Sequence, residues 1–580
     1  MTTPTLPTRA TAFPRHPLRP TDRGPLARAL RSGWPYAAVA AVVVVLGLPM
    51  LNFPFGSDQA IFAEIGRVIG EGGMPYTDAW DQKPPAIFLI YTVAIRGPLG
   101  VMRNLRAFDL AWTAATVVAL MALGHRWWTL RAGAIGGLLY GAVYVTTTGY
   151  WYSAQPDGFI ALPLILALLL YDAAVGNAGD RSRLVRQRML LIVVGLLLGL
   201  AFQLRFIMAA LVPFFPLVEV AGRPWKERLR LWLDRMLWLG AGFVLVQVAL
   251  LLYLAAGGAL GDFIAATRFA SGYTSLGGPW APEEPTTTKY LETVRLSFLF
   301  WSLGRLIMTA PAIIGGFLGV FVVRERRVQQ MVLFVALGYL GIAAQGKFFP
   351  YHYLYLLPFL ALLAGWAWDQ AFRLLTRARG RGMALVGGAT LVVGLALSTP
   401  EVTDSAWLQW ESHVRYYTEP ETREEYYDVF GPWGGGTFSY RASRETAYYL
   451  QRRTEPDDYL YVWGYDPLIY LLAQRPSSSR FIYSFPLMSD WAPRSWQRDF
   501  LAELEAKPPV YFVVQRYEGA RWITGHSVDT GDYIAWFPEL DAWLTENYRL
   551  ETEIEDYLIY RRVERGEQGV GNRQSAMGRT

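Results

Sequence analysis

The sequence predicts a polytopic α-helical membrane protein with a C-terminal α/β domain outside the membrane. Three observations support this fold class. The 580 residues are 53% hydrophobic and only 18% charged, which is too apolar for an ordinary soluble domain. Long apolar runs recur up to about residue 400, separated by short arginine-rich clusters. Beyond that point the chain becomes polar and aromatic.

Composition excludes several other classes of protein. The chain has no cysteine, so neither a disulfide framework nor a thiolate metal site is available. The formal net charge of +6 comes from arginines that stand between apolar runs, which is typical of cytoplasmic loops. We therefore expect membrane lipids around the protein and no nucleic-acid partner.

The N-terminal residues 1–33 are rich in Pro, Thr and Arg and predict a disordered cytoplasmic tail. The apolar run at 34–52 ends without a small-x-small cleavage site, so we expect it to remain as a membrane anchor. The rest of the chain divides into a transmembrane domain at 34–399, an α/β domain at 400–565 and a disordered tail at 566–580.

About eleven apolar runs are candidates to cross the hydrocarbon core of a membrane. They are 34–52, 106–124, 132–151, 158–175, 189–203, 205–220, 236–256, 303–323, 328–345, 354–372 and 383–398. A further apolar stretch, 84–101, opens with two prolines and contains Arg96.

Charge decides whether that stretch crosses. The basic clusters lie at 126–131, 181–188, 223–230, 324–327 and 373–381. They share one side of the membrane only if 84–101 does not cross, so we predict an interfacial helix there. With the N-terminus in the cytoplasm of this multi-pass plasma-membrane protein, the α/β domain lies outside.

Helical and strand-like patterns alternate beyond residue 400. Helices are expected at 444–453, 466–475 and 495–506, and strands at 458–464, 480–485 and 510–515. The loop at 431–440 contains three consecutive glycines, but no Lys-Ser/Thr follows and no strand precedes. We interpret it as a flexible connection rather than a phosphate loop.

Charged residues from distant parts of the chain share the predicted outer face of the membrane. They are Asp58, Lys83, Asp157, Arg205 and Lys347. A charge beside hydrocarbon is costly unless it has a partner or a function. The placement therefore predicts a site at the outer mouth of the helices.

Four outer segments carry these residues in a recognisable order. They are GSDQAIFAEIGR with Asp58, PYTDAWDQKPP with Tyr76, Asp78, Asp81 and Lys83, YSAQPDGF with Asp157, and GKFFPYHYLYLLP with Lys347, His352 and Tyr353. Together they resemble the GT-C membrane glycosyltransferases, in particular bacterial relatives of protein O-mannosyltransferase and of lipid A aminoarabinose transferase. The resemblance covers roughly residues 34–400.

The resemblance implies transfer of a sugar from a polyprenyl-phosphate donor to a glycan, lipid or protein acceptor, commonly with inversion. Such a reaction needs a carboxylate to take the acceptor's proton and fixed cations to stabilise the leaving phosphate. The implied catalytic residues are Asp58, as general base, and Asp157. The implied phosphate-binding residues are Lys83, Arg205 and Lys347, and the implied substrate-binding residues are Tyr76, Asp78, Asp81, His352 and Tyr353.

Each main candidate also has a purely structural interpretation. Asp58 could cap the helix that follows it, and Lys83 could be an interfacial anchor. Asp157 could pair with Arg205 to neutralise a buried charge. His352, within an aromatic stretch, could be a packing histidine.

Two positions depart from the family pattern. Gln59 follows Asp58 where the protein O-mannosyltransferases have a second acidic residue, and Gln82 precedes Lys83 where the aminoarabinose transferases have an acidic residue. The sugar and the acceptor are therefore not assigned. Hard cations prefer several oxygen ligands and few carboxylates converge, so we expect no obligatory metal.

Two other functions compete with the transferase. In a transporter or flippase of lipid-linked sugars, Asp157 and Arg205 would line a passage, although the sequence shows none of the paired halves common in transporters. A membrane scaffold that binds partners through its C-terminal domain is the third alternative.

Overall fold

The computed structural model describes residues 25–175, 181–220, 224–278, 287–377, 399–431 and 438–563. The helices of the N-terminal part are α1 (Pro25–Gly47), η1 (Leu48–Asn52), α2 (Ser57–Gly70), α3 (Ala86–Ala94), α4 (Val101–Trp127), α5 (Leu130–Thr147), α6 (Gly149–Tyr152), α7 (Pro156–Val175), α8 (Arg181–Leu204), η2 (Phe206–Leu211), α9 (Phe214–Val220), α10 (Trp225–Ala256), α11 (Leu260–Ser275), α12 (Thr287–Leu303), α13 (Leu306–Phe317), the π-helical η3 (Leu318–Val322), α14 (Arg326–Gln345), η4 (Pro350–Tyr353) and α15 (Leu357–Arg377).

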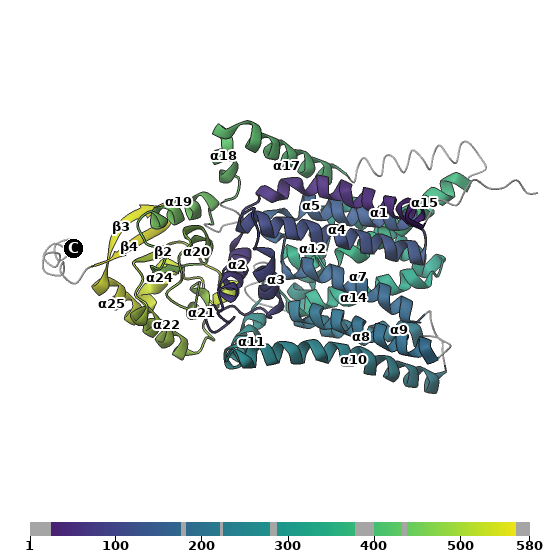
Figure 1. Ribbon diagram of the computed structural model, residues 1–580, viewed down its shortest axis with the longest axis horizontal. Helices are drawn as coiled ribbons and strands as arrows, with labels where there is room; N and C mark the ends of the chain where they lie inside the picture. The colour runs from purple at the N-terminus through teal and green to yellow at the C-terminus, as the bar shows by residue number, and fades with distance from the viewer. Residues whose placement is uncertain are drawn as a thin grey trace, which may run out of the picture.

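The long helices form a bundle, and an α/β domain covers one end of it (Figure 1). In the described residues, six helices are long and apolar enough to cross a membrane, and a seventh is added if α12 and α13–η3, bent by 118°, count as one span. This finding supports a membrane location. α2, α3 and α11 lie between the bundle and the α/β domain (Figure 1).

Small residues let neighbouring helices approach closely, as is common in membranes. A Cβ atom at Gly195 in α8 would lie 2.1 Å from the Leu239 carbonyl oxygen in α10. A Cβ at Gly242 would likewise lie 2.0 Å from the Ile192 carbonyl oxygen. These two glycines therefore fix the spacing of α8 and α10.

The structure corrects several expected boundaries. α1 begins at Pro25, so residues 25–33 are helical rather than part of a disordered tail. The expected span at 205–220 is broken into η2 and α9. The expected span at 303–323 is the second arm of the bent pair.

Some expected segments differ in length from the observed ones, and others lie wholly or partly outside the described residues. The stretch at 84–101 contains the nine-residue α3, which is too short to cross hydrocarbon. The expected span at 383–398, most of the loop at 431–440, and both terminal tails apart from 25–33 lie outside the described residues.

The C-terminal part follows the same chain order. Its elements are α17 (Pro400–Thr418), η5 (Pro420–Thr422), α18 (Arg423–Asp428), α19 (Tyr440–Gln451), β1 (Leu460–Trp463), α20 (Leu468–Ala473), α21 (Phe485–Met488), α22 (Arg494–Ala506), β2 (Tyr511–Gln515), α23 (Arg521–Thr524), α24 (Thr530–Tyr533), η6 (Ile534–Trp536), α25 (Pro538–Asn547), β3 (Tyr548–Ile554) and β4 (Tyr557–Arg562).

One four-stranded sheet, in the order β1-β2-β4-β3, organises this domain. β1 and β2 are parallel, with Val462 opposite Val513, whereas β2–β4 and β3–β4 are antiparallel. β1 and β2 are buried along their whole length, which explains their continuous apolar sequence. The expected strands at 458–464 and 510–515 are thus confirmed in shortened form.

The expected strand at 480–485 does not form. Its carbonyl and amide groups serve other partners instead: the Trp80 amide donates to the Arg480 carbonyl at 2.7 Å, and Tyr461 donates its hydroxyl to the Phe481 carbonyl at 3.0 Å. This apolar segment is buried between its own domain and Trp80 of the membrane part, not by strand pairing. The hairpin β3–β4 was not expected, because its outward face is polar.

We expect the loop after α4 to lie in the cytoplasm and the α/β domain to lie outside, so two exposed positions in these parts should be labelled differently. Because the chain lacks cysteine, His125→Cys at the end of α4 and Glu505→Cys in α22 each create a single thiol. We expect a membrane-impermeant maleimide to label Glu505→Cys in intact cells and His125→Cys only after permeabilisation. Labelling of His125→Cys in intact cells contradicts the cytoplasmic assignment of that loop.

Candidate functional site

Asp58 lies in the first turn of α2 but does not cap it. The N-cap residue is Gly56, whose amide donates to Gln59 Oε1 at 2.7 Å. Asp58 is half-buried, and its Oδ1 accepts a hydrogen bond of 2.8 Å from the Tyr465 hydroxyl of the C-terminal domain. The helix-cap interpretation of Asp58 is therefore not supported by its contacts.

Gln59, which stands where the resembled family has an acid, fixes the backbone of a neighbouring loop. Its Nε2 donates at 2.9 Å to each of the carbonyl oxygens of Tyr150, Trp151 and Ser153. A carboxylate could not make these bonds, since it has no N–H. The departure at this position therefore has a structural reason.

A buried arginine from α4 joins the same two loops. Arg106 donates to the Pro54 carbonyl, to the Tyr150 carbonyl at 3.0 Å and to Ser153 Oγ at 2.6 Å. Pro54 precedes α2 and Ser153 precedes α7. Arg106 therefore sets the position of Asp58 relative to the start of α7.

The start of α7 carries the second predicted catalytic residue. Asp157 is fully buried and forms an ion pair with Arg205, in which Arg205 Nε lies 2.7 Å from Asp157 Oδ1. The Arg205 side chain is 14% exposed. Arg205 also donates to Gln345 Oε1 at the end of α14 and lies 5.9 Å from the centre of the Tyr351 ring. The expected Asp157–Arg205 pair is thus present, and it joins α7, α8 and α14.

The segment before α3 forms a tight loop that presents Asp81 and Lys83. Tyr76, with a φ of 72°, donates its hydroxyl to the Lys83 carbonyl at 2.8 Å. Asp81 Oδ2 accepts from the Lys83 amide at 3.1 Å, and Asp81 Oδ1 accepts from the Tyr483 hydroxyl at 2.7 Å. Burial raises the pKa of the Asp81 carboxyl, against the opposing effects of Lys83 and of Tyr483.

Lys83 and Lys347 approach the Asp157–Arg205 pair from separate loops. The Lys83 ammonium has no hydrogen bond or ion pair with the described residues, but it lies within electrostatic range of Asp157, Lys347 and His352. Lys347 donates to the carbonyl oxygens of Gly277 at 3.2 Å and Trp522 at 2.9 Å. Burial, followed by repulsion from Lys83, lowers the pKa of Lys347 to about 7.

His352 lies among these cations. Its ring is buried and meets the Tyr351 ring edge-on at 4.7 Å, and its Nδ1 has no hydrogen-bond partner in the described chain. Burial, together with Arg205, Lys83 and Lys347, lowers the pKa of His352 well below its usual value. His352 is thus a neutral histidine within electrostatic range of three basic side chains, a setting that suits an anionic ligand.

The residues described so far form one cluster: Asp58, Asp81, Lys83, Asp157, Arg205, Lys347 and His352. Two other predicted site residues do not join it. Tyr353 stacks on Trp301 of α12, with ring centres 5.0 Å apart. Asp78 is exposed, and its Oδ2 accepts from the Met74 amide at 2.7 Å. Tyr76 contributes through its hydroxyl, which donates to the backbone carbonyl of Lys83.

Several tyrosines at the cluster are not among the predicted site residues. Tyr351 faces Arg205, the Tyr273 ring lies 3.8 Å from Lys347 Nζ, and Tyr465 and Tyr483 reach Asp58 and Asp81. The chain has 33 tyrosines, so their identity alone gives no signal. Only the spacing in PYHYLY, where Tyr351 and Tyr353 flank His352, marked this region.

An apolar groove of about 600 Å³ lies next to the cluster, between α3, α4, α8 and α10. One wall contains Ala86, shortly after Lys83, and the other contains Leu200, shortly before Arg205. These two lining residues are three and five positions along the chain from Lys83 and Arg205, respectively. A separate cavity of about 460 Å³, between η1, α19 and α20, contains none of the predicted site residues.

The described residues contain no group of three or more His, Asp or Glu side chains placed to hold a metal ion. The polar chemistry described above comes from carboxylates, cations, tyrosine hydroxyls and one neutral imidazole.

No protein-family model matches the sequence, and no curated protein sequence matches it. Solved structures do match the fold. ArnT from Cupriavidus metallidurans bound to undecaprenyl phosphate is 15% identical, with a TM-score of 0.54 over 93% of this chain and 99% of that chain. ArnT from the same organism in the apo state is 15% identical, with a TM-score of 0.53 over 92% of this chain and 98% of that chain. The chain therefore has a GT-C-like fold, as the sequence resemblance implied.

The buried Asp157–Arg205 pair predicts a clear pattern of stability. Arg205→Met leaves a buried carboxylate without its partner, so we expect the free energy of unfolding to fall by about 3 to 5 kcal/mol. The double variant Asp157→Asn, Arg205→Met removes both charges and should recover part of that loss. The measurement is thermal unfolding in detergent, and a double variant less stable than Arg205→Met contradicts the pairing argument.

Arg415→Met is the matched control for the ion-pair prediction. Arg415 pairs with Glu419 at 3.2 Å, but both side chains are exposed, at 49% and 44%. Exposed pairs contribute little, so its melting temperature should stay close to that of the wild type.

Proposed function

We propose that this protein is a glycosyltransferase that moves a sugar from a polyprenyl-phosphate donor to an acceptor at the outer face of the cytoplasmic membrane. The observation that carries the proposal is the convergence of Lys83, Arg205 and Lys347 on the neutral His352, beside an apolar groove. A donor that joins an anion to a long hydrocarbon chain matches both features at once.

The groove suits the lipid part of such a donor. Its walls are formed almost entirely by apolar side chains of α3, α8 and α10, which an isoprenoid chain can cover without leaving polar groups unpaired. The solved ArnT structure holds undecaprenyl phosphate. We propose that a related carrier lies in this groove, with its phosphate at Lys83 and Arg205.

The cations suit the leaving group. When the sugar–phosphate bond breaks, negative charge develops on the phosphate, and fixed cations stabilise it most in a site with little water. Lys83 has an ammonium free of protein partners within the described chain, so it can bind the phosphate directly. Arg205 keeps Asp157 as its partner, and this pairing orients its guanidinium.

Asp58 is the proposed general base. Tyr465 occupies its Oδ1, and no described residue donates to its Oδ2. In the proposed step, an acceptor hydroxyl or amine gives its proton to Asp58 Oδ2 and forms a bond to the anomeric carbon. The bond from that carbon to the phosphate oxygen breaks with its electron pair, releasing polyprenyl phosphate and inverting the anomeric centre.

The contacts of Asp157 and Arg205 favour this enzyme over a transporter or flippase. Charges that line a passage need to face it, whereas Asp157 is fully buried against Arg205, whose side chain is only 14% exposed. Their pairing instead suits a fixed site at the end of the bundle.

The proposal predicts distinct defects for the base and for the phosphate ligand. Cells without the protein should lack one envelope sugar and accumulate its polyprenyl-phosphate form, as measured by mass spectrometry of glycans and lipids. Asp58→Asn should fail to restore transfer while binding the purified donor normally, because the amide keeps the shape but accepts no proton. Lys83→Ala should weaken donor binding as well as turnover.

Glu71→Gln is a suitable control for Asp58→Asn, because Glu71 is an exposed carboxylate at the other end of α2, 61% exposed. It should restore the envelope sugar fully. Near-normal turnover by Asp58→Asn excludes this residue as the base, and unchanged glycans and lipids in the deletion strain exclude the transferase.

Donor affinity should depend on pH through Lys347. Because the pKa of Lys347 is about 7, its ammonium is charged at pH 6 and mostly neutral at pH 8. A polyprenyl-phosphate sugar is a phosphodiester that does not titrate in this range, so its Kd should rise severalfold between these pH values. Lys347→Met should bind more weakly at pH 6 and lose this dependence. Lys83→Met should keep a dependence whose midpoint lies at higher pH, because repulsion from Lys83 lowers the pKa of Lys347; a pH dependence that survives in Lys347→Met contradicts the assignment.

A further inference from the structure

Two tyrosines of the C-terminal domain reach two carboxylates of the membrane part. Tyr465 donates to Asp58 Oδ1 at 2.8 Å, and Tyr483 donates to Asp81 Oδ1 at 2.7 Å. Hydrogen bonds to ionised groups are shorter and stronger than neutral ones. The α/β domain therefore contacts the proposed catalytic carboxylate itself.

The sheet of the domain holds Tyr465 in place. Tyr465 follows β1 after Gly464, and its amide donates at 3.0 Å to Oε1 of Gln515, the last residue of β2. A Cβ atom at Gly464 would lie 2.7 Å from that Oε1, so glycine makes room for the contact. The carboxyl ends of parallel strands are where α/β proteins commonly place functional groups, and here they face Asp58.

The two tyrosine rings also support each other. Tyr465 stacks on Phe485 at 4.6 Å and meets Tyr483 edge-on at 5.5 Å. Both rings are therefore fixed before any substrate binds, and each phenol has little freedom to turn away from its carboxylate.

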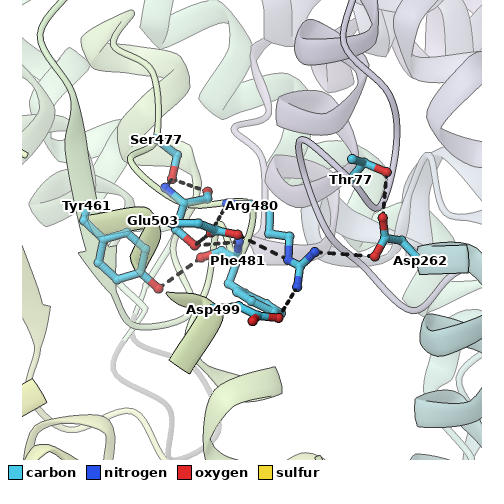
Figure 2. A network of polar contacts seen from close by, with 9 residues as sticks. Thr77, Asp262, Tyr461, Ser477, Arg480, Phe481, Asp499 and Glu503 are labelled. Carbon is cyan, nitrogen blue, oxygen red and sulfur yellow. Dashed lines mark hydrogen bonds and ion pairs between the residues drawn. The ribbon is translucent and has the colours of Figure 1, made fainter. Parts of the chain in front are cut away.

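A separate set of contacts fixes the domain on the membrane part. Figure 2 shows Arg480 reaching Asp262 of α11 on one side and Asp499 and Glu503 of α22 on the other, at 3.4, 2.9 and 3.4 Å. Thr77 donates to the same Asp262 at 2.9 Å (Figure 2). The loop that carries Asp81 and Lys83 is thus connected to the domain through α11.

We propose that Tyr465 is a positioning residue of the sugar-transfer reaction. It holds Oδ1 of Asp58, so that Oδ2 points to the acceptor in one fixed orientation, and Tyr483 holds Asp81 in the same way. A base held in a productive geometry reacts faster than one free to rotate. The inference rests on the proposed function, and it makes the C-terminal domain part of the catalytic site.

The test compares Tyr465→Phe with the wild type, using the donor lipid extracted from cells that lack the protein. Phenylalanine keeps the ring, so we expect an unchanged melting temperature. Without the phenol, kcat should fall about tenfold at an unchanged KM for the donor, since only the orientation of Asp58 is lost.

Tyr511→Phe is the matched control. Tyr511 is buried in β2 of the same domain and donates its hydroxyl to a carboxylate, Glu551, at 3.0 Å, but it makes no contact with the proposed site. It should keep the wild-type kcat. A general effect of losing one tyrosine–carboxylate bond in this domain would lower kcat in both variants.

A double variant distinguishes action through Asp58 from a structural effect. If Tyr465 works by holding the base, Tyr465→Phe should add no further loss to the residual rate of Asp58→Asn. A further tenfold loss in that background, or a wild-type kcat for Tyr465→Phe, overturns the inference while the proposed function stands. A wild-type protein that transfers no sugar from this donor overturns the proposed function, and this inference with it.

Discussion

The ion pair between Asp157 and Arg205 is the constraint on which the site depends. A charge at the end of an apolar bundle is stable only when its partner is close, and here the two groups lie 2.7 Å apart with Asp157 fully buried. The pair therefore fixes where α7 begins relative to where α8 ends. Through Gln345 and Tyr351, Arg205 extends this constraint to α14 and to the turn that carries His352.

The remaining site residues are arranged around that fixed point. Arg106 and Gln59 join the loops before α2 and α7, so Asp58 cannot move independently of Asp157. Lys83 and Lys347 add positive charge close to the pair, and this charge together with burial keeps His352 neutral. Arg205 is paired with Asp157, whereas the Lys83 ammonium has no ion pair in the described chain, so an anionic ligand can pair with Lys83.

The α/β domain completes this arrangement from the other side. Its tyrosines donate hydrogen bonds to the carboxylates Asp58 and Asp81 of the membrane part, and its Trp522 carbonyl accepts one from Lys347. Without these contacts, the three charged groups would have water as their hydrogen-bond partner in place of the domain. Because both chain parts supply the partners of the same charged groups, the geometry of this site depends on docking of the domain.

The sequence by itself determined the class of the fold and the main charged residues. The length of an apolar run indicates a helix that crosses hydrocarbon, and short runs rich in β-branched and aromatic residues indicate strands such as β2. Both patterns can be recognised because they reflect local burial. Asp58, Lys83, Asp157, Arg205 and Lys347 were evident since charges beside apolar runs are rare and costly.

Tertiary structure alone decided which partners those charges have. Tyr465 and Asp58 are separated by 407 positions, and no local pattern distinguishes this tyrosine from the other tyrosines of the chain. The same holds for Tyr351, which faces Arg205, and Tyr353, which packs on Trp301. The apolar segment at 480–485 looked like a strand for a related reason. Its burial comes from Trp80 and from side chains of its own domain rather than from strand pairing, and a sequence records that a segment is buried but not what covers it.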